Sequence, residues 1–110
     1  MNIVNLTPHA LNIHNEDGDL VVTVEPSGQV ARCEVKRTRQ PDFRGAPGVP
    51  LFSATYGEVI DLPAKTSLDT IYVVSGMTRA AVPDRVDVFQ PGELLRNEQG
   101  QVVGCIGLSR

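Results

Sequence analysis

The sequence predicts a small, mainly β domain, built as a compact barrel or sandwich of short antiparallel strands with at most one or two short helical turns. Valine, isoleucine, leucine and threonine dominate, tryptophan is absent, and proline and glycine recur along the whole chain. This composition is typical of short strands separated by turns. No repeat, low-complexity tract or change of composition divides the 110 residues, so we expect a single domain over residues 1–110.

The best-defined local element is a hairpin near the N-terminus. Residues 2–6 form an extended segment that ends before Pro8. Residues 10–14 then alternate apolar with polar side chains, as a half-buried strand does. Residues 20–24 return as the partner strand across an Asp17-Gly18 turn, one of the dipeptides that favour tight hairpins.

The next predicted strand covers residues 30–36, after a turn at residues 26–28. Its alternation places Ala31, Cys33 and Val35 on one face, because successive side chains of a strand point to opposite sides. We therefore expect Cys33 to point inward.

Residues 37–50 are the least regular part of the chain. Their prolines and glycines interrupt both a helix and a central strand. The sequence predicts a long loop here, and loops of this length in small domains are often functional or mobile.

The second half continues the pattern of short elements. The strongest strand candidate is residues 69–75, which are nearly all β-branched or aromatic. The other expected elements are one or two strands within 51–62, a helical turn within 77–82, an extended segment at 86–89, a turn at Pro91-Gly92, and a terminal hairpin of 94–96 with 101–108.

Charge and hydropathy exclude several classes of protein. Ten basic and thirteen acidic side chains give a net charge of -3, which does not favour long nucleic acids or an anionic membrane surface. No apolar run approaches the roughly 20 residues of a membrane span, and the N-terminus lacks the pattern of a signal peptide. We expect a cytoplasmic protein with Cys33 and Cys105 as unbonded thiols.

Candidate catalytic or metal-binding groups are few. His9 and His14 lie on opposite faces if the strand between them is regular, and no metal-ligand spacing such as C-x-x-C or H-E-x-x-H is present. Cys105 lies in an apolar strand, which favours a packed core thiol over a nucleophile. Three carboxylates that could serve as acid and base, or as solvated loop residues, are close in sequence: Asp84, Asp87 and Glu93. We expect no catalytic residue, no metal and no cofactor.

Arginine placement is the most informative chemical feature. Four arginines bracket the 37–50 stretch and four others mark the C-terminal third. Arginine presents a planar fork of donors that suits phosphate oxygens, and an aromatic ring can stack a base. The predicted ligand-binding residues are Arg79, Arg85, Phe89, Arg96, Asn97 and Arg110. The alternative interpretation is that these arginines form surface ion pairs with neighbouring acidic residues.

Three segments carry a resemblance to known sequences: Asn5-Leu6-Thr7-Pro8-His9, Tyr72-Val73-Val74-Ser75, and Pro83-Asp84-Arg85 through the C-terminal Gly104-Cys105-Ile106-Gly107-Leu108-Ser109-Arg110. Over nearly the whole chain they resemble a group of small proteins of bacteriophages, prophages and bacteria. The resemblance implies a viral or mobile-element origin, with the host bacterial cytoplasm as the location if a phage encodes the chain. It matches no catalytic pattern. Phage proteins of this size include sponges that sequester nucleotide second messengers of bacterial immunity, and no residue is carried over from them.

These observations favour a homo-oligomeric binding protein that holds a small anionic, nucleotide-like ligand and counters bacterial defence. Small β domains often cover exposed strand edges by association, and an oligomer can supply a composite pocket. Two other hypotheses remain open. One is a protein-interaction module that inhibits a host protein through residues 37–50, and the other is a small metal- or His-dependent hydrolase using His9 or the three carboxylates.

Overall fold

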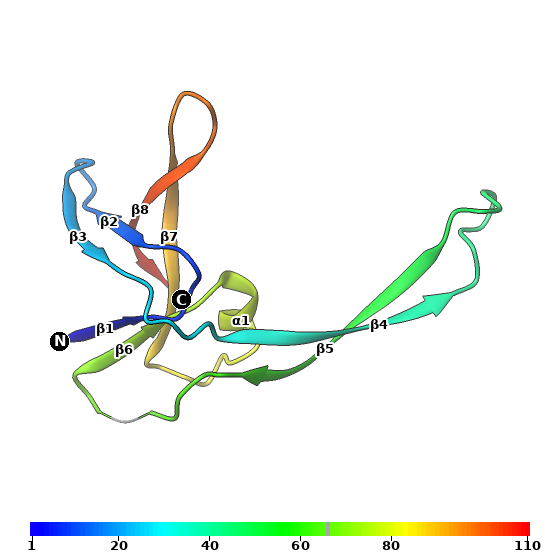
Figure 1. The fold of residues 1–110 in the computed structure, drawn as a ribbon, viewed down its shortest axis with the longest axis horizontal. Coiled ribbons are helices and arrows are strands. Elements are labelled where there is room, and N and C mark those ends of the chain that lie inside the picture. Colours follow the sequence, from blue (N-terminus) through cyan, green and yellow to red (C-terminus); the bar gives the residue numbers. More distant parts are fainter. Residues whose placement is uncertain (66) are drawn as a thin grey trace.

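In the computed structural model, which describes residues 1–65 and 67–110, six strands form one barrel-like sheet and two more form a long projecting hairpin (Figure 1). In chain order the elements are β1 (Asn2–Asn5), β2 (Leu11–His14), β3 (Leu20–Val24), β4 (Arg32–Gln40), β5 (Leu51–Ile60), β6 (Thr70–Val73), α1 (Gly76–Ala80), β7 (Val88–Arg96) and β8 (Val102–Ser109). The predicted fold class, a small mainly β barrel or sandwich with at most one or two helical turns, is confirmed, and of the two architectures left open the structure shows the barrel.

The barrel sheet has the strand order β1-β6-β7-β8-β2-β3. The β2–β3 and β7–β8 hairpins are antiparallel, whereas β1–β6, β6–β7 and β2–β8 pair in parallel. A bridge between Asn5 and Pro26 joins the two sheet edges, so the sheet is mostly closed. The antiparallel pairing that the sequence predicts therefore holds for the two hairpins of this sheet. Its other neighbouring strands run parallel, and parallel neighbours need crossover connections instead of tight turns.

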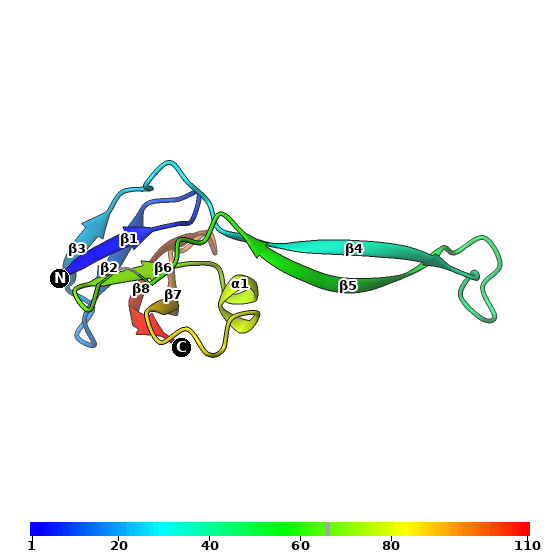
Figure 2. The ribbon, with the colours of Figure 1, turned by 90° about the horizontal axis from the view of Figure 1, so that it is seen from below.

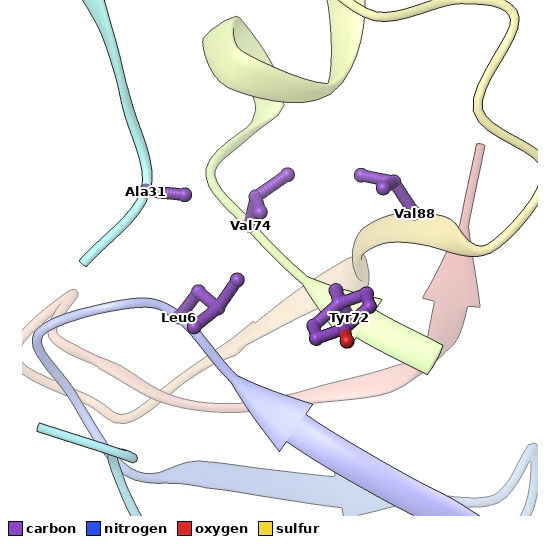
Figure 3. Close-up of a cluster of buried hydrophobic side chains, with 5 residues drawn as sticks. All are labelled: Leu6, Ala31, Tyr72, Val74 and Val88. Atoms are coloured by element: carbon purple, nitrogen blue, oxygen red, sulfur yellow. The ribbon is translucent and has the colours of Figure 1, made fainter. Parts of the chain in front are cut away.

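Two apolar clusters form the core, one on each face of the sheet at β6, because the adjacent strand residues Tyr72 and Val73 belong to different clusters. The first consists of Leu6, Ala31, Tyr72, Val74 and Val88 (Figure 3). The second consists of Leu11, Ile13, Val73 and Cys105. The adjacent residues Val73 and Val74 are both fully buried but belong to different clusters. The segment predicted as the strongest strand is thus central, and Cys105 is the core thiol that its environment predicted.

Both predicted hairpins are present. Gly18 in the turn between β2 and β3 adopts a φ of 88°, a conformation that glycine reaches without steric penalty. The Asn15 side-chain oxygen accepts hydrogen bonds from the backbone N–H groups of Asp17 and Asp19, each at 3.0 Å. The predicted helical turn is α1, which begins after Ser75, whose hydroxyl accepts a hydrogen bond from the Thr78 N–H.

The structure corrects the predicted loop at residues 37–50. β4 and β5 pair as far as Gln40 with Leu51, so only residues 41–50 form the connection. Pro41 directly follows β4 and Pro50 directly precedes β5. At both places a missing N–H interrupts no strand pairing. The irregular composition therefore marks a turn at the tip of a hairpin, which we call the arm (residues 32–60).

The predicted strand at residues 30–36 also differs from the observed one. Ala31 is buried in the first cluster, but the chain leaves the barrel there and continues as β4. Cys33 is consequently half-buried at the base of the arm instead of in the core, and Val35 is 42% exposed.

The predicted turn at Pro91-Gly92 is wrong, because β7 continues through both residues. Pro91 pairs with Leu108 of β8. On its other side β7 pairs with β6 only as far as Phe89, opposite Val73. Pro91 thus lies beyond the end of the β6–β7 pairing, where its missing N–H removes no hydrogen bond to β6.

The arm makes the molecule elongated. It extends away from the barrel in both views (Figures 1 and 2), and the radius of gyration is 17.4 Å, against about 13 Å expected for a globular domain of this length. No helix in the described part of the chain is long and apolar enough to cross a membrane.

Candidate functional site

Arg110 and Phe89 form a platform at one end of β7 and β8. The Arg110 guanidinium lies 5.0 Å from the centroid of the Phe89 ring, within the range of a cation–π interaction. The ladder pairs Gln90 with Ser109, so one step further along it sets Phe89 opposite Arg110. Arg110 is exposed, and the ion pairs found among the described residues, Arg39–Asp42 and Arg85–Asp87, do not involve it.

Arg85 has a structural partner. Its Nε and Nη2 atoms donate to the two carboxylate oxygens of Asp87 at 2.9 and 3.0 Å, and Nη2 also donates to the Pro63 carbonyl at 2.8 Å. The hydrogen bond from Arg85 holds the pKa of the Asp87 carboxyl below its usual value and raises the pKa of the guanidinium. For this arginine the ion-pair interpretation applies.

Arg79 is buried in α1, with 9% of its surface exposed. One terminal nitrogen donates to the Val82 carbonyl at 3.0 Å, and the buried Nε has no hydrogen-bond partner. A buried donor without a partner carries a desolvation penalty of about 1–3 kcal/mol.

Arg96 and Asn97 lie at the opposite end of β7. Arg96 donates to the Gly100 carbonyl at 2.9 Å, and the Asn97 side-chain oxygen accepts from the N–H groups of Gln99 and Gln101 at 3.0 Å. Arg96 is seven positions along the extended strand from Phe89, which corresponds to a distance of roughly 23 Å. Within one chain the six predicted residues therefore do not lie together. Phe89 and Arg110 are two of them that are in contact.

A groove with a volume of about 660 Å³ lies elsewhere, between β2, β7 and β8. Its lining includes Leu11, Leu94, Val103 and Cys105, together with Thr7, His9 and Asn12. It contains none of the six predicted residues and neither lysine nor arginine. The groove suits an apolar group and offers no charge to an anion.

The candidate catalytic groups are scattered. His14 lies in the hairpin with its Nδ1 3.1 Å from the Gly18 carbonyl oxygen, and His9 is exposed at the groove. Burial raises the pKa of the Cys105 thiol, which lowers the fraction of reactive thiolate. Asp87 is bound to Arg85. Within residues 1–65 and 67–110, no three His, Cys, Asp or Glu side chains are grouped as a metal site requires.

The arm is the feature that sequence reasoning missed. Cross-strand pairs set Val35 beside Tyr56 and Arg39 beside Phe52, and the Arg39 guanidinium lies 5.6 Å from the Phe52 centroid. The sequence gives little signal for its length, because the alternation that begins at Ala31 ends at Val35, residues 36–40 are all polar, and prolines follow at 41, 47 and 50.

Comparisons of the chain with protein-family models, with curated proteins and with solved structures found no match.

Proposed function

We propose that this chain is a phage-type binding protein that acts as a homo-oligomer and sequesters a small anionic, nucleotide-like ligand without transforming it. In an infected bacterium it would lower the free concentration of a nucleotide messenger of immunity. The observation that carries the proposal is the platform: an exposed guanidinium, outside the ion pairs of the described residues, lies 5.0 Å from an aromatic ring.

The chemistry of the platform suits a nucleotide. Bases stack on aromatic rings and on the planes of arginine guanidinium groups. Arg110 is exposed, so the N–H donors of its guanidinium can bind phosphate oxygens as a charge-assisted fork. One residue pair can therefore contact both parts of a nucleotide.

The state of the candidate reactive groups favours binding over hydrolysis. The Cys105 thiol is buried and its pKa is raised, so it is a poor nucleophile. Asp87 is held by two hydrogen bonds from Arg85, which opposes the proton transfer expected of a general acid or base.

We expect Arg110→Ala to weaken binding of ADP-ribose or a cyclic dinucleotide about 10- to 100-fold, the effect of losing hydrogen bonds to a charged group. Isothermal titration calorimetry measures this, with adenosine as the uncharged comparison ligand. Arg96→Ala is the matched control, because this arginine is also exposed but lies at the far end of β7. Loss of affinity in Arg96→Ala and not in Arg110→Ala would contradict the platform assignment.

The same titrations distinguish binding from turnover. Mass spectrometry of the ligand recovered from the protein should return it intact. Conversion that disappears in His9→Ala would instead support the hydrolase hypothesis.

A second candidate function, inhibition of a host protein, is favoured by the exposed aromatic residues of the arm. Phe52 and Tyr56 are 54% and 58% exposed, and aromatic side chains are enriched at the centres of protein interfaces. Replacing residues 37–54 by a two-residue Asn-Gly turn retains the Lys36–Thr55 pair as a short hairpin. This variant should lose capture of a host protein in a pull-down and keep nucleotide binding, whereas unchanged capture would exclude the arm.

A further inference from the structure

The arm contacts the rest of its own chain at its base, where β4 and Tyr56 lie against α1 and the residues after it, and its outer part extends away from the barrel (Figures 1 and 2). β4 pairs only with β5 among the described strands, so each arm strand has an outer edge without a strand partner. An isolated two-stranded hairpin is marginally stable in water. A hairpin with nine- and ten-residue strands therefore needs a surface to pack against.

The two faces of the arm differ in polarity. Residues paired across the ladder share a face, so one face carries Val35 with Tyr56, Arg37 with Ala54, and Arg39 with Phe52. The other carries Lys36 with Thr55, Thr38 with Ser53, and Gln40 with Leu51. The first face is an apolar and aromatic surface with two arginines, and its large side chains are 42–58% exposed.

A complementary surface exists on the barrel. β3 is an edge strand of the barrel sheet, and among the described strands its residues pair with those of β2 only. Its residues Leu20, Val21 and Val22 are 56%, 64% and 38% exposed. An exposed apolar edge strand is a template for association with another strand or chain.

The charges of the two surfaces are opposite. Residues 36–44 of the arm hold four basic side chains and one acidic, a net charge of +3. Residues 16–25, which contain β3 and the turn before it, hold four acidic side chains and no basic one, a net charge of -4. Complementary charges of this kind direct one surface to another and set their register.

We propose that the arm of one copy of this chain lies along β3 of a second copy, with Val35, Phe52 and Tyr56 against the exposed β3 side chains and the arm cations against the acidic turn. The contact is between copies, because the arm extends away from β3 of its own chain in both views (Figures 1 and 2). It joins two different surfaces, and such contacts close as a reciprocal dimer or a ring where the rotation between copies permits and otherwise continue as an open filament; the proposed assembly is closed. The inference rests on the homo-oligomer of the proposed function and is independent of its ligand.

Charge reversal tests this contact. The arm variant carries Arg37→Glu and Arg39→Glu, the two arginines of the apolar face, and the barrel variant carries Asp17→Lys and Asp19→Lys. All four side chains are exposed, so we expect the substitutions to leave the fold of each chain intact and to change only the association between chains. Native mass spectrometry and light scattering should show a ligand-free wild-type oligomer whose mass is a multiple of 11.9 kDa. Each variant alone should dissociate at least about tenfold more readily, because like charges face each other.

Mixing the two variants is the decisive step. Each reversed arm then meets a reversed barrel, and each native arm meets a native barrel, so assembly should return in the mixture only. Glu98→Lys, a reversal in the exposed β7–β8 turn, is the control and should leave the wild-type oligomer unchanged. A monomeric wild type, including one that captures a host protein, overturns the inference, as does an oligomer that both variants retain. Because no ligand is present, failure here is distinguishable from failure of nucleotide binding.

Discussion

Replacing Gly92 with alanine is expected to lower the free energy of unfolding by about 2 kcal/mol or more, within the range for a side chain forced into filled space. A Cβ atom at this position would lie 2.0 Å from the Ile106 carbonyl oxygen and 2.9 Å from that of Gly107. Both obstacles are backbone atoms, which cannot rotate away as a side chain can. β8 must therefore move off β7, and because this ladder sets Arg110 opposite Phe89, ligand binding should weaken as well.

Thermal and urea denaturation measure the effect, which corresponds to a fall of roughly 10 °C in melting temperature. Gly57→Ala is the matched control, because a Cβ there would lie 3.6 Å from the Glu34 Cβ, an ordinary contact. Gly57 lies in β5 of the arm, and its replacement should change the stability by less than about 0.5 kcal/mol. Equal stabilities of the two variants would show that the β7–β8 ladder tolerates a side chain at position 92.

The elements that the sequence predicts correctly are those governed by local chemistry. The Asp17-Gly18 turn and the strands on either side of it are adjacent in sequence, and Gly18 adopts the positive φ that the turn requires. The burial of residues 72–74 follows from their composition, since a nearly continuous apolar strand needs cover on both faces.

The direction of the arm could not be predicted in this way. An alternating strand within a barrel and an alternating strand that leaves it have the same pattern, because the period reports only that two faces differ. Val35 and Phe52 look like core residues by type, yet they are 42% and 54% exposed. What decides between the two is the surface that covers them, which for this arm we infer to belong to a second chain.

Position in the sequence does not show which of the predicted ligand-binding residues lie together in space. Phe89 and Arg96 are seven positions apart in one extended strand, which separates them by roughly 23 Å. Phe89 and Arg110 are far apart in sequence but opposite across the ladder. Their pairing depends on a register shift between Leu95 and Arg96. Without that shift, the Arg96–Val102 register would set Phe89 opposite Ser109, and a one-residue slip of this kind turns side chains to the other face.

Asp87→Asn is expected to destabilise the protein at neutral pH by about 1–2 kcal/mol, the lower part of the range for hydrogen bonds to charged groups. Asp87 is 5% exposed and Arg85 is 26% exposed, so solvent screens the pair only in part. The bond from Arg85 to the Pro63 carbonyl also ties the segment after β5 to the loop before β7, and it depends on Asp87 to orient the guanidinium.

The pH dependence identifies the mechanism. The folded pKa of Asp87 lies below the ordinary value of 3.8, chiefly because of the hydrogen bond from Arg85. Its contribution is therefore fully present well above pH 3.8 and is lost as the pH falls through the lower folded pKa. Urea denaturation between pH 7 and pH 2.5 should show the difference between wild type and Asp87→Asn shrinking below about pH 4, while the exposed neighbour Asp84→Asn shows no such difference. A difference that stays constant to pH 2.5 would mean that Asp87 stabilises the fold by its shape and not by its charge.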